Sequence, residues 1–379
     1  MKIYIIAGEA SGDLHGSNLV KELLRLSNSL ELRGWGGDLM RDEGVRVVKH
    51  YRDLAFMGFI EVVKNLPTIL RNFRMCKEDI LEFRPDALIL IDYPGFNLRM
   101  AKWAHEQGIP VLYYIAPQAW AWKENRVHAM RKYITQLYVV LPFEESFFRN
   151  HGISVFYSGH PLLDIPQSGT LSREAFLTKY GLSQRPFIAL LPGSRKQEIR
   201  AMLPVMMCMK VHYPEYDFII AGAPGQTAEF YSEVVKDKSI PVLFGVTSKL
   251  LLYAKAGLIT SGTATLEAGI SALPQIVCYR GSAISYAIAK RLVKVKYISL
   301  VNLILNKPAV KELIQHNFNE DSLKSALGTL LNDADAAVEL ARDYANLRES
   351  LGGPGASERT ANHMLKILRE APKVHTSPK

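Results

Sequence analysis

The stretches IYIIAGEASGDLHG at residues 3–16 and IALLPGSRKQEI at residues 188–199 decide the fold, because each opens one half of the chain. Each begins with an aliphatic run typical of a buried parallel strand and passes through small residues into a helical pattern. At such a strand–turn–helix junction, the unpaired N–H groups of the helix face an anionic ligand. The pair therefore predicts two α/β domains facing a ligand-binding cleft.

Neither junction carries a common nucleotide motif. The turns read GEASGD and PGSRKQE, which match neither G-x-G-x-x-G nor G-x-x-x-x-G-K-[ST]. This weighs against a dinucleotide dehydrogenase and a P-loop NTPase. An enzyme that uses a nucleotide sugar is the alternative that we favour.

Composition narrows the class of protein further. A chain of 379 residues is long enough for two domains, and three cysteines without C-x-x-C spacing predict a reducing compartment. No leader pattern and no apolar run of about 18 residues occurs, so we expect a cytoplasmic protein without a membrane span. The net charge of +9 favours phosphate-bearing partners, but the scattered basic residues argue against nucleic acid.

Alternating strand and helix patterns predict parallel sheets covered by helices in both halves. The expected strands are 3–7, 87–92, 111–116, 136–141, 187–191, 217–222, 257–260 and 275–279. A stretch rich in Pro, Gly and Ser at 160–175 predicts the linker, and a last helix over about 335–370 is expected to cross back to the first domain. The expected domains are 1–165, joined by 346–379, and 166–345.

Two loops of the second half carry groups suited to a nucleotide diphosphate. SGTATLE at 261–267 is a turn that leads into a helix, whose first N–H groups face an anion. Glu267 either accepts two ribose hydroxyls or only stabilises the helix start. Arg195 follows a strand end, where it either grips a phosphate or pairs with a surface acid. The predicted binding residues are Arg195, Glu198, Ser261, Gly262, Thr263, Ala264 and Glu267.

Acidic residues follow two strands of the first half. Asp92 ends an apolar strand just before a Pro-Gly pair, which leaves its carboxylate at the sheet edge as a candidate general base. Ser11 and Asp13 lie in the first loop and equally fit caps of a helix that begins at Leu14. Glu9 is less easily explained as a cap, so it joins the candidate catalytic residues.

Two apolar features fit a sugar or lipid ligand as well as an ordinary core. PQAWAW places Trp120 and Trp122 beyond a strand end. Between Phe59 and Phe73, apolar residues recur at helical spacing, with Pro67 expected to divide two short helices. This stretch fits either a core-facing helix or a cationic surface for acidic lipid or an acyl chain. Its assigned apolar residues are Phe56, Met57, Phe59, Val62, Val63, Leu66 and Leu70.

No group of side chains has the spacing of metal ligands. The histidines are isolated, and the D-x-D string at 333–335 lies far from the predicted strand ends. We therefore expect no metal and no cofactor. Arginine and helix N-termini would then have to stabilise a departing diphosphate.

Several motifs together resemble the lipid-A-disaccharide synthase family over nearly the whole chain. SGTATLE is of a type shared with other nucleotide-sugar glycosyltransferases, but GEASGD, PQAWAW and VNL in combination are specific to this family. The matching motifs, in order, are GEASGD (8–13), IDYPGFN (91–97), PQAWAW (117–122), LLPGSR (190–195), SGTATLE (261–267) and AKRLVK with YISLVNL (289–303).

The resemblance implies a GT-B fold, with an acceptor-binding Rossmann-like domain followed by a UDP-sugar-binding one. It implies an inverting transfer that joins UDP-2,3-diacylglucosamine to 2,3-diacylglucosamine 1-phosphate by a β-1,6 bond and releases UDP. Asp92 matches the acid proposed as base in the family, although Asp13 or Glu9 could hold that role. The other implied roles are diphosphate binding by Arg195 and the helix start at Gly262, ribose binding by Glu267, and completion of the site by Asn302, Glu9, Ser11 and Asp13.

Both implied substrates carry acyl chains, which favours the lipid interpretation of residues 56–75. The resemblance thereby implies a peripheral protein on the cytoplasmic face of the inner membrane of a Gram-negative bacterium, in contact with anionic lipid; a homodimer stays open. The rivals are a UDP-N-acetylglucosamine 2-epimerase, the transferase of a peptidoglycan lipid, and a non-catalytic, membrane-docked nucleotide-sugar sensor. The tryptophan motif weighs against the epimerase, and Asp92 weighs against the sensor.

Overall fold

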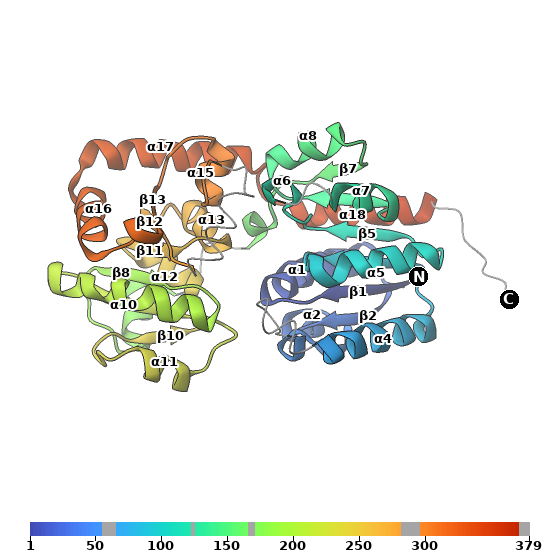
Figure 1. The fold of residues 1–379 in the computed structure, drawn as a ribbon, viewed down its shortest axis with the longest axis horizontal. Coiled ribbons are helices and arrows are strands. Elements are labelled where there is room, and N and C mark those ends of the chain that lie inside the picture. The colour runs from blue at the N-terminus through green and yellow to red at the C-terminus, as the bar shows by residue number, and fades with distance from the viewer. Residues whose placement is uncertain (55–65, 123–125, 166–170, 282–295, 371–379) are drawn as a thin grey trace. The chain divides into compact units, whose positions relative to one another are not determined.

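The computed structural model describes residues 1–54, 66–122, 126–165, 171–281 and 296–370. The chain divides into two compact units: unit 1 is Met1–Asp164 with Leu351–Lys379, and unit 2 is Ile165–Ser350. Each unit is a parallel sheet with helices packed on both faces (Figure 1).

The sheet of unit 1 has seven strands in the order β3-β2-β1-β4-β5-β6-β7, and every pair is parallel. The four strands expected from the sequence form its middle, because strands buried on both faces read as continuous apolar runs. The outer strands β2, β3 and β7 were missed, since their residues are partly exposed and mixed in polarity. The strands are β1 (Lys2–Ala7), β2 (Glu31–Gly36), β3 (Arg46–His50), β4 (Ala87–Ile91), β5 (Val111–Tyr114), β6 (Gln136–Val139) and β7 (Val155–Tyr157).

The helices of unit 1 alternate with these strands. They are α1 (Ala10–Leu26), α2 (Asp38–Asp42), the 3-10 turn η1 (Tyr51–Leu54), α4 (Leu66–Phe83), α5 (Pro94–Glu106), α6 (Ala119–Trp122), α7 (Arg126–Tyr133), α8 (Pro142–Asn150), η2 (Pro161–Asp164) and α18 (Ala356–Glu370).

Unit 2 repeats the plan with six parallel strands in the order β10-β9-β8-β11-β12-β13. The four expected strands are again central, and the short edge strands β10 and β13 were missed. The strands are β8 (Phe187–Leu191), β9 (Asp217–Gly222), β10 (Val242–Phe244), β11 (Ala256–Thr260), β12 (Gln275–Tyr279) and β13 (Lys311–Ile314).

The described helices of unit 2 lie on both faces of this sheet (Figure 1). They are α9 (Arg173–Lys179), α10 (Lys196–His212), α11 (Ala228–Val234), α12 (Thr247–Tyr253), α13 (Thr263–Ile270), α15 (Leu300–Leu305), η3 (Gln315–Asn317), α16 (Glu320–Asn332) and α17 (Ala334–Ser350).

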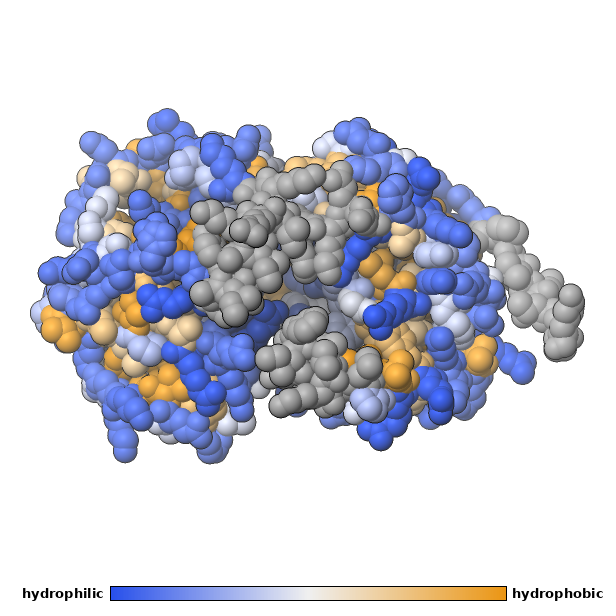
Figure 2. All heavy atoms as spheres, in the orientation of Figure 1, coloured by the Kyte–Doolittle hydropathy of each residue, from blue (hydrophilic) through white to orange (hydrophobic). Residues whose placement is uncertain are grey.

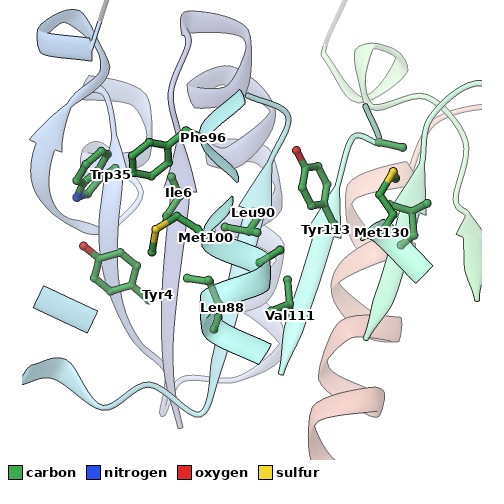
Figure 3. Packing of buried hydrophobic residues seen from close by; sticks show 14 of the residues in the cluster. Tyr4, Ile6, Trp35, Leu88, Leu90, Phe96, Met100, Val111, Tyr113 and Met130 are labelled. Atoms are coloured by element: carbon green, nitrogen blue, oxygen red, sulfur yellow. The ribbon is translucent and has the colours of Figure 1, made fainter. Parts of the chain in front are cut away.

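Alternate residues of each central strand feed apolar layers on opposite faces of the sheet. In β8, Ile188 and Leu190 pack into one buried cluster, while Ala189 and Leu191 pack into another. In unit 1, Trp35 and Phe96 lie side by side in the core, with ring centroids 5.1 Å apart (Figure 3). The surface drawn in Figure 2 is mainly hydrophilic, as expected when the apolar residues of each unit are buried.

The expected single helix over 335–370 is wrong, because α17 and α18 are separated by LGGPG at residues 351–355. Gly352, Gly353 and Gly355 have φ of +81°, +73° and +90°, a left-handed conformation that ends α17 and that only glycine adopts without strain. The chain then re-enters unit 1, where α18 packs against α1.

Candidate active site

Asp92 lies at the carboxyl edge of the unit 1 sheet, in a turn of unusual backbone geometry. Asp92 and Tyr93 both have a left-handed backbone, with φ of +44° and +49°, which residues other than glycine rarely adopt. Buried hydrogen bonds hold this turn: the Asp92 carbonyl accepts from Asn97 Nδ2 at 2.7 Å and from the Tyr113 hydroxyl at 2.6 Å. Because these bonds fix the Asp92 backbone, its side chain leaves the strand in a defined direction.

The acidity of Asp92 is strongly perturbed. Burial raises the pKa of its carboxyl to about 7, and the negative charge of Glu9 adds to the rise. Glu9 is close because β1 and β4 are parallel neighbours with Ala7 paired to Ile91, so the residues after them share one edge. A carboxylate with this pKa accepts a proton efficiently near neutral pH, as a general base must.

Ser11 and Asp13 do not cap a helix from Leu14, because α1 begins at Ala10 and contains both residues in its first turn. The buried carboxylate of Asp13 instead caps α2: Oδ1 accepts from the N–H groups of Gly37 (2.7 Å) and Met40 (3.1 Å), and Oδ2 accepts from that of Leu39 (3.2 Å). With three donors on its two oxygens, Asp13 is a poor candidate for a base. Ser11 is half-buried on the same turn.

Glu144 is a buried acid at the same edge that sequence reasoning missed. Its side chain is 1% exposed, and burial raises its pKa to about 7, with a smaller contribution from the charge of Asp92. Trp120 is half-buried, and its Nε1 donates to Glu144 Oε1 at 3.0 Å. LPFEE at 141–145 is a helix start after a strand, and that signal could have indicated an acid at the sheet edge.

Part of the predicted lipid surface lies outside the described residues, namely Phe56, Met57, Phe59, Val62 and Val63; of Leu66 and Trp122, only the backbone is described. The described part is α4, in which Pro67 stands in the first turn, where proline is tolerated. Leu70 is 57% exposed on this helix, whereas Phe73 faces inward and stacks on Phe96 with centroids 4.2 Å apart.

Arg195 and Glu198 form the turn between β8 and α10 in unit 2. Arg195 is the N-cap residue of α10, and its Nη1 lies 3.1 Å from Glu198 Oε1. Gly193 turns the chain with φ +105°, and Gln226, which was not predicted, ties the loop through a 2.9 Å bond to the carbonyl of Ser194. The guanidinium of Arg195 is therefore ion-paired with Glu198, and this pair orients it.

The turn between β11 and α13 is open. Gly262 has φ +150°, and a Cβ at this position would meet no atom of the described residues within 4 Å, which leaves room for a ligand among them at the helix N-terminus. Ser261 donates to the carbonyl of Ile298 at 2.8 Å, while Thr263 is exposed and Ala264 half-buried on the first turn of α13. Burial raises the pKa of Glu267, one turn further, to about 7.

Asn302 has a structural role that the motif did not predict. Its side chain is 1% exposed, donates to the Val310 carbonyl and to Glu312 Oε1, both at 2.9 Å, and accepts from the Val310 N–H at 2.8 Å. These bonds hold α15 to the start of β13. These hydrogen bonds occupy both the nitrogen and the oxygen of the Asn302 amide. They explain Asn302 better as a residue that joins α15 to β13 than as a ligand-binding group.

The structure thus brings the predicted residues together in two groups. In unit 1, Glu9, Asp92 and Trp120 follow β1, β4 and β5, which are neighbouring strands; in unit 2, Arg195 and the Gly262 turn follow β8 and β11, also neighbours. The first group offers proton transfer, and the second offers a positive side chain beside a helix N-terminus. Among the described residues, no cluster of His, Cys, Asp and Glu is suited to a metal, and no helix is long and apolar enough to cross a bilayer.

Solved structures share this fold at low sequence identity. UDP-GlcNAc 2-epimerase from Neisseria meningitidis, bound to UDP-GlcNAc, superposes with a TM-score of 0.66 at 13% identity, covering 97% of this chain and 100% of that one. CalG4, the calicheamicin glycosyltransferase, gives 0.60 at 16% identity, with 98% and 99% covered. The two Rossmann-like units are those of a GT-B fold.

Whole-length relatives and a family model are more specific. Lipid-A-disaccharide synthase of Syntrophus aciditrophicus is 36% identical over 377 residues, which cover 97% of this chain and 98% of that protein. The protein of the same name from Geobacter sulfurreducens is 36% identical over 376 residues, with 97% of each chain covered. The model of the lipid-A-disaccharide synthetase family matches residues 3–367. Because the family model matches nearly the full length of the chain and the relatives are 36% identical over nearly their whole length, the chain belongs to the lipid-A-disaccharide synthetase family.

Proposed function

We propose that the protein condenses UDP-2,3-diacylglucosamine with 2,3-diacylglucosamine 1-phosphate to give the β-1,6-linked disaccharide 1-phosphate and UDP. Family membership supports the reaction, and the perturbed, geometrically fixed Asp92 is the observation that carries the mechanism. The reaction inverts the anomeric centre, because a single displacement needs only one base and one leaving-group site.

Asp92 is the general base of this mechanism. As the acceptor's 6-hydroxyl oxygen bonds to the anomeric carbon of the donor, its proton passes to the Asp92 carboxylate and the bond from that carbon to the UDP oxygen breaks. Burial and the charge of Glu9 give Asp92 the raised pKa that makes it a stronger base than an ordinary carboxylate. The pKa of Asp92 thus lies near neutral pH, where the carboxylate has to accept the proton.

Unit 2 binds the UDP moiety and unit 1 the acceptor. A comparison of two glycines supports this assignment: the turn at Gly262 is open, whereas a Cβ on Gly8 would clash with the ring of Tyr93, which covers the corresponding turn after β1. A diphosphate approaches a backbone turn closely only where no side chain fills it. Arg195 and the α13 N-terminus then stabilise the charge that develops on the departing UDP, and Glu267 accepts the ribose hydroxyls.

Acceptor-dependent release of UDP from UDP-2,3-diacylglucosamine tests the proposal. We expect the wild type to release UDP only when 2,3-diacylglucosamine 1-phosphate is present, and Asp92→Asn to lower kcat by about 10²–10⁴-fold. Asp86→Asn is the matched control, since Asp86 precedes the same strand at the opposite edge of the sheet, where it accepts from the Lys2 N–H.

Each outcome has a separate meaning. Undiminished release by the Asp92 variant would keep the transferase and move the base elsewhere, with Glu9 next to be tested. No release by the wild type would contradict the reaction, and interconversion of UDP-N-acetylglucosamine with its 2-epimer would then identify the epimerase alternative.

We also propose that α4 contributes to a surface for anionic lipid. Leu70, Arg74 and Leu81 are exposed and spaced by four and seven residues, so they follow one face of the helix. Both proposed substrates carry acyl chains and are met at a membrane. Sedimentation with phosphatidylglycerol vesicles should fall for Leu70→Ser/Leu81→Ser, but not for Val338→Ser, an exposed apolar residue of unit 2. Unchanged binding of the double variant would rule this surface out.

A further inference from the structure

Glu144 lies at the start of α8, directly beyond β6, with both carboxylate oxygens engaged. Oε2 accepts from the N–H groups of Val140 (3.2 Å) and Leu141 (3.0 Å), and Oε1 accepts from Trp120 Nε1 (3.0 Å). The side chain is almost completely buried. One oxygen thus stabilises the strand-to-helix turn, and the other holds an indole.

Stabilising the turn does not by itself explain a buried acid here. A carboxylate loses hydration when it is buried, and burial raises the pKa of Glu144 to about 7. Its neighbour Glu145 supplies a negative charge to the same helix turn from a half-buried position, paired with Arg149 at 2.7 Å. Beyond its two bonds to the turn, the bond to Trp120 is the contact by which the buried acid reaches another element.

Trp120 is held from α8 on two sides. Its ring stands at 89° to that of Phe143, with centroids 4.9 Å apart, while Glu144, the next residue, takes its N–H. These contacts place α6 beside α8 (Figure 1). Trp120 is half-buried and follows β5, the strand next to β4, after which Asp92 lies. A fixed, partly exposed aromatic ring beside a general base suits a sugar ring or the start of an acyl chain.

We propose that Glu144 is a positioning residue for the acceptor: it fixes the indole of Trp120 as a flat apolar wall against which the acylated glucosamine acceptor packs. This inference rests on the proposed function, because it assigns the acceptor to unit 1. Glu144 itself touches no substrate. Its effect is on acceptor binding and leaves the donor site of unit 2 unchanged.

Steady-state kinetics on the full chain, with each substrate varied while the other is saturating, test the inference. We expect Glu144→Gln and Trp120→Phe each to raise the acceptor KM about tenfold, the effect of losing a charge-assisted hydrogen bond, without changing the donor KM. The double variant should be no worse than either single variant, because both remove the same contact. Glu145→Gln is the control, with the same change one residue away at a half-buried position that pairs with Arg149.

An acceptor KM of Glu144→Gln no higher than that of Glu145→Gln would overturn the inference, as would equal increases for both substrates or multiplied effects in the double variant. If Glu144→Gln fails to fold, Trp120→Phe decides alone, since it keeps the turn bonds of Glu144 and replaces the indole and its N–H by a smaller ring that Glu144 cannot hold. A wild type without acceptor-dependent UDP release would instead contradict the proposed function.

Discussion

At the scale of single residues, the carboxyl edge of the unit 1 sheet concentrates groups with perturbed acidity. Asp92 and Glu144 both have a pKa near 7 because they are buried, while Asp13 on the same edge is satisfied by three backbone N–H groups. Carboxylates of the same chemistry therefore differ in role according to how deeply they are buried and how many hydrogen-bond donors they contact.

Glu9 should set the pH dependence of the reaction through its charge. Activity needs Asp92 deprotonated, so kcat/KM rises with pH through the pKa of about 7. Glu9→Gln removes a negative charge that raises this pKa, and the acid limb of the profile should move to lower pH. Glu22→Gln, on the exposed side of the same helix, should leave it in place. A limb that stays or moves upward for Glu9→Gln would contradict the coupling.

Gly8 and Tyr93 should behave as a pair. An added Cβ on Gly8 overlaps the Tyr93 ring, so Gly8→Ala is expected to lower the free energy of unfolding by about 1–3 kcal/mol. Tyr93→Ala removes the obstacle, and the double variant should lose less stability than the sum of the two single changes. Gly95→Ala is the control, because a Cβ there meets nothing within 4 Å in the part of the chain that the structure describes. Urea unfolding measures all four, and strict additivity would show that the contact is absent.

At the scale of elements, helix ends depend on partners distant in sequence. Asp13 caps α2, and Asp164 caps α18 by accepting from the N–H groups of Gly355 (2.6 Å), Ala356 (3.0 Å) and Ser357 (2.7 Å). The glycines before α18 turn the chain, and Asp164 then fixes where the new helix starts. Elements of unit 1 that lie 191 to 193 residues apart in the sequence are thereby joined.

Removal of the α18 cap should be measurable. We expect Asp164→Ala to lower the free energy of unfolding by about 1–2 kcal/mol, because three partly buried N–H groups lose their acceptor. Asp333→Ala removes a cap that makes one bond, to the N–H of Ala336 at the exposed start of α17, and should cost less. Chemical denaturation compares the two, and a larger loss for Asp333→Ala would contradict the assignment.

At the scale of the whole molecule, two apolar sheets explain most of the fold, but buried polar groups tie segments together within unit 1. His15 on α1 and His160 before η2 stack edge to face with centroids 6.3 Å apart. Burial lowers the pKa of His15 to about 4 and that of His160 to about 3, although the charge of Asp164 raises that of His15 slightly. Both imidazoles are therefore neutral in the folded protein near neutral pH.

This pair should make unit 1 sensitive to acid. As pH falls below the unfolded value of 6.5, the unfolded chain binds protons that the folded chain does not, so stability falls until the folded pKa values near 4 and 3 are reached. His160→Asn, whose amide oxygen can still accept from the Leu162 N–H, should flatten this decline. The exposed His128→Asn should not. Urea midpoints between pH 7 and pH 4 measure the effect, and equal slopes for both variants would contradict it.

The sequence by itself determined the two parallel sheets and the positions of Asp92, Arg195 and the Gly262 turn. Those strands are buried on both faces and must be apolar throughout, and loops after neighbouring parallel strands necessarily share one edge. Only the tertiary structure decided the edge strands β2, β3, β7, β10 and β13, whose mixed composition carries no period. It also decided which backbone N–H groups Asp13 caps, which groups the Asn302 amide bonds and that Glu144 accepts from Trp120, because hydrogen-bond partners distant in the chain are not specified by local sequence.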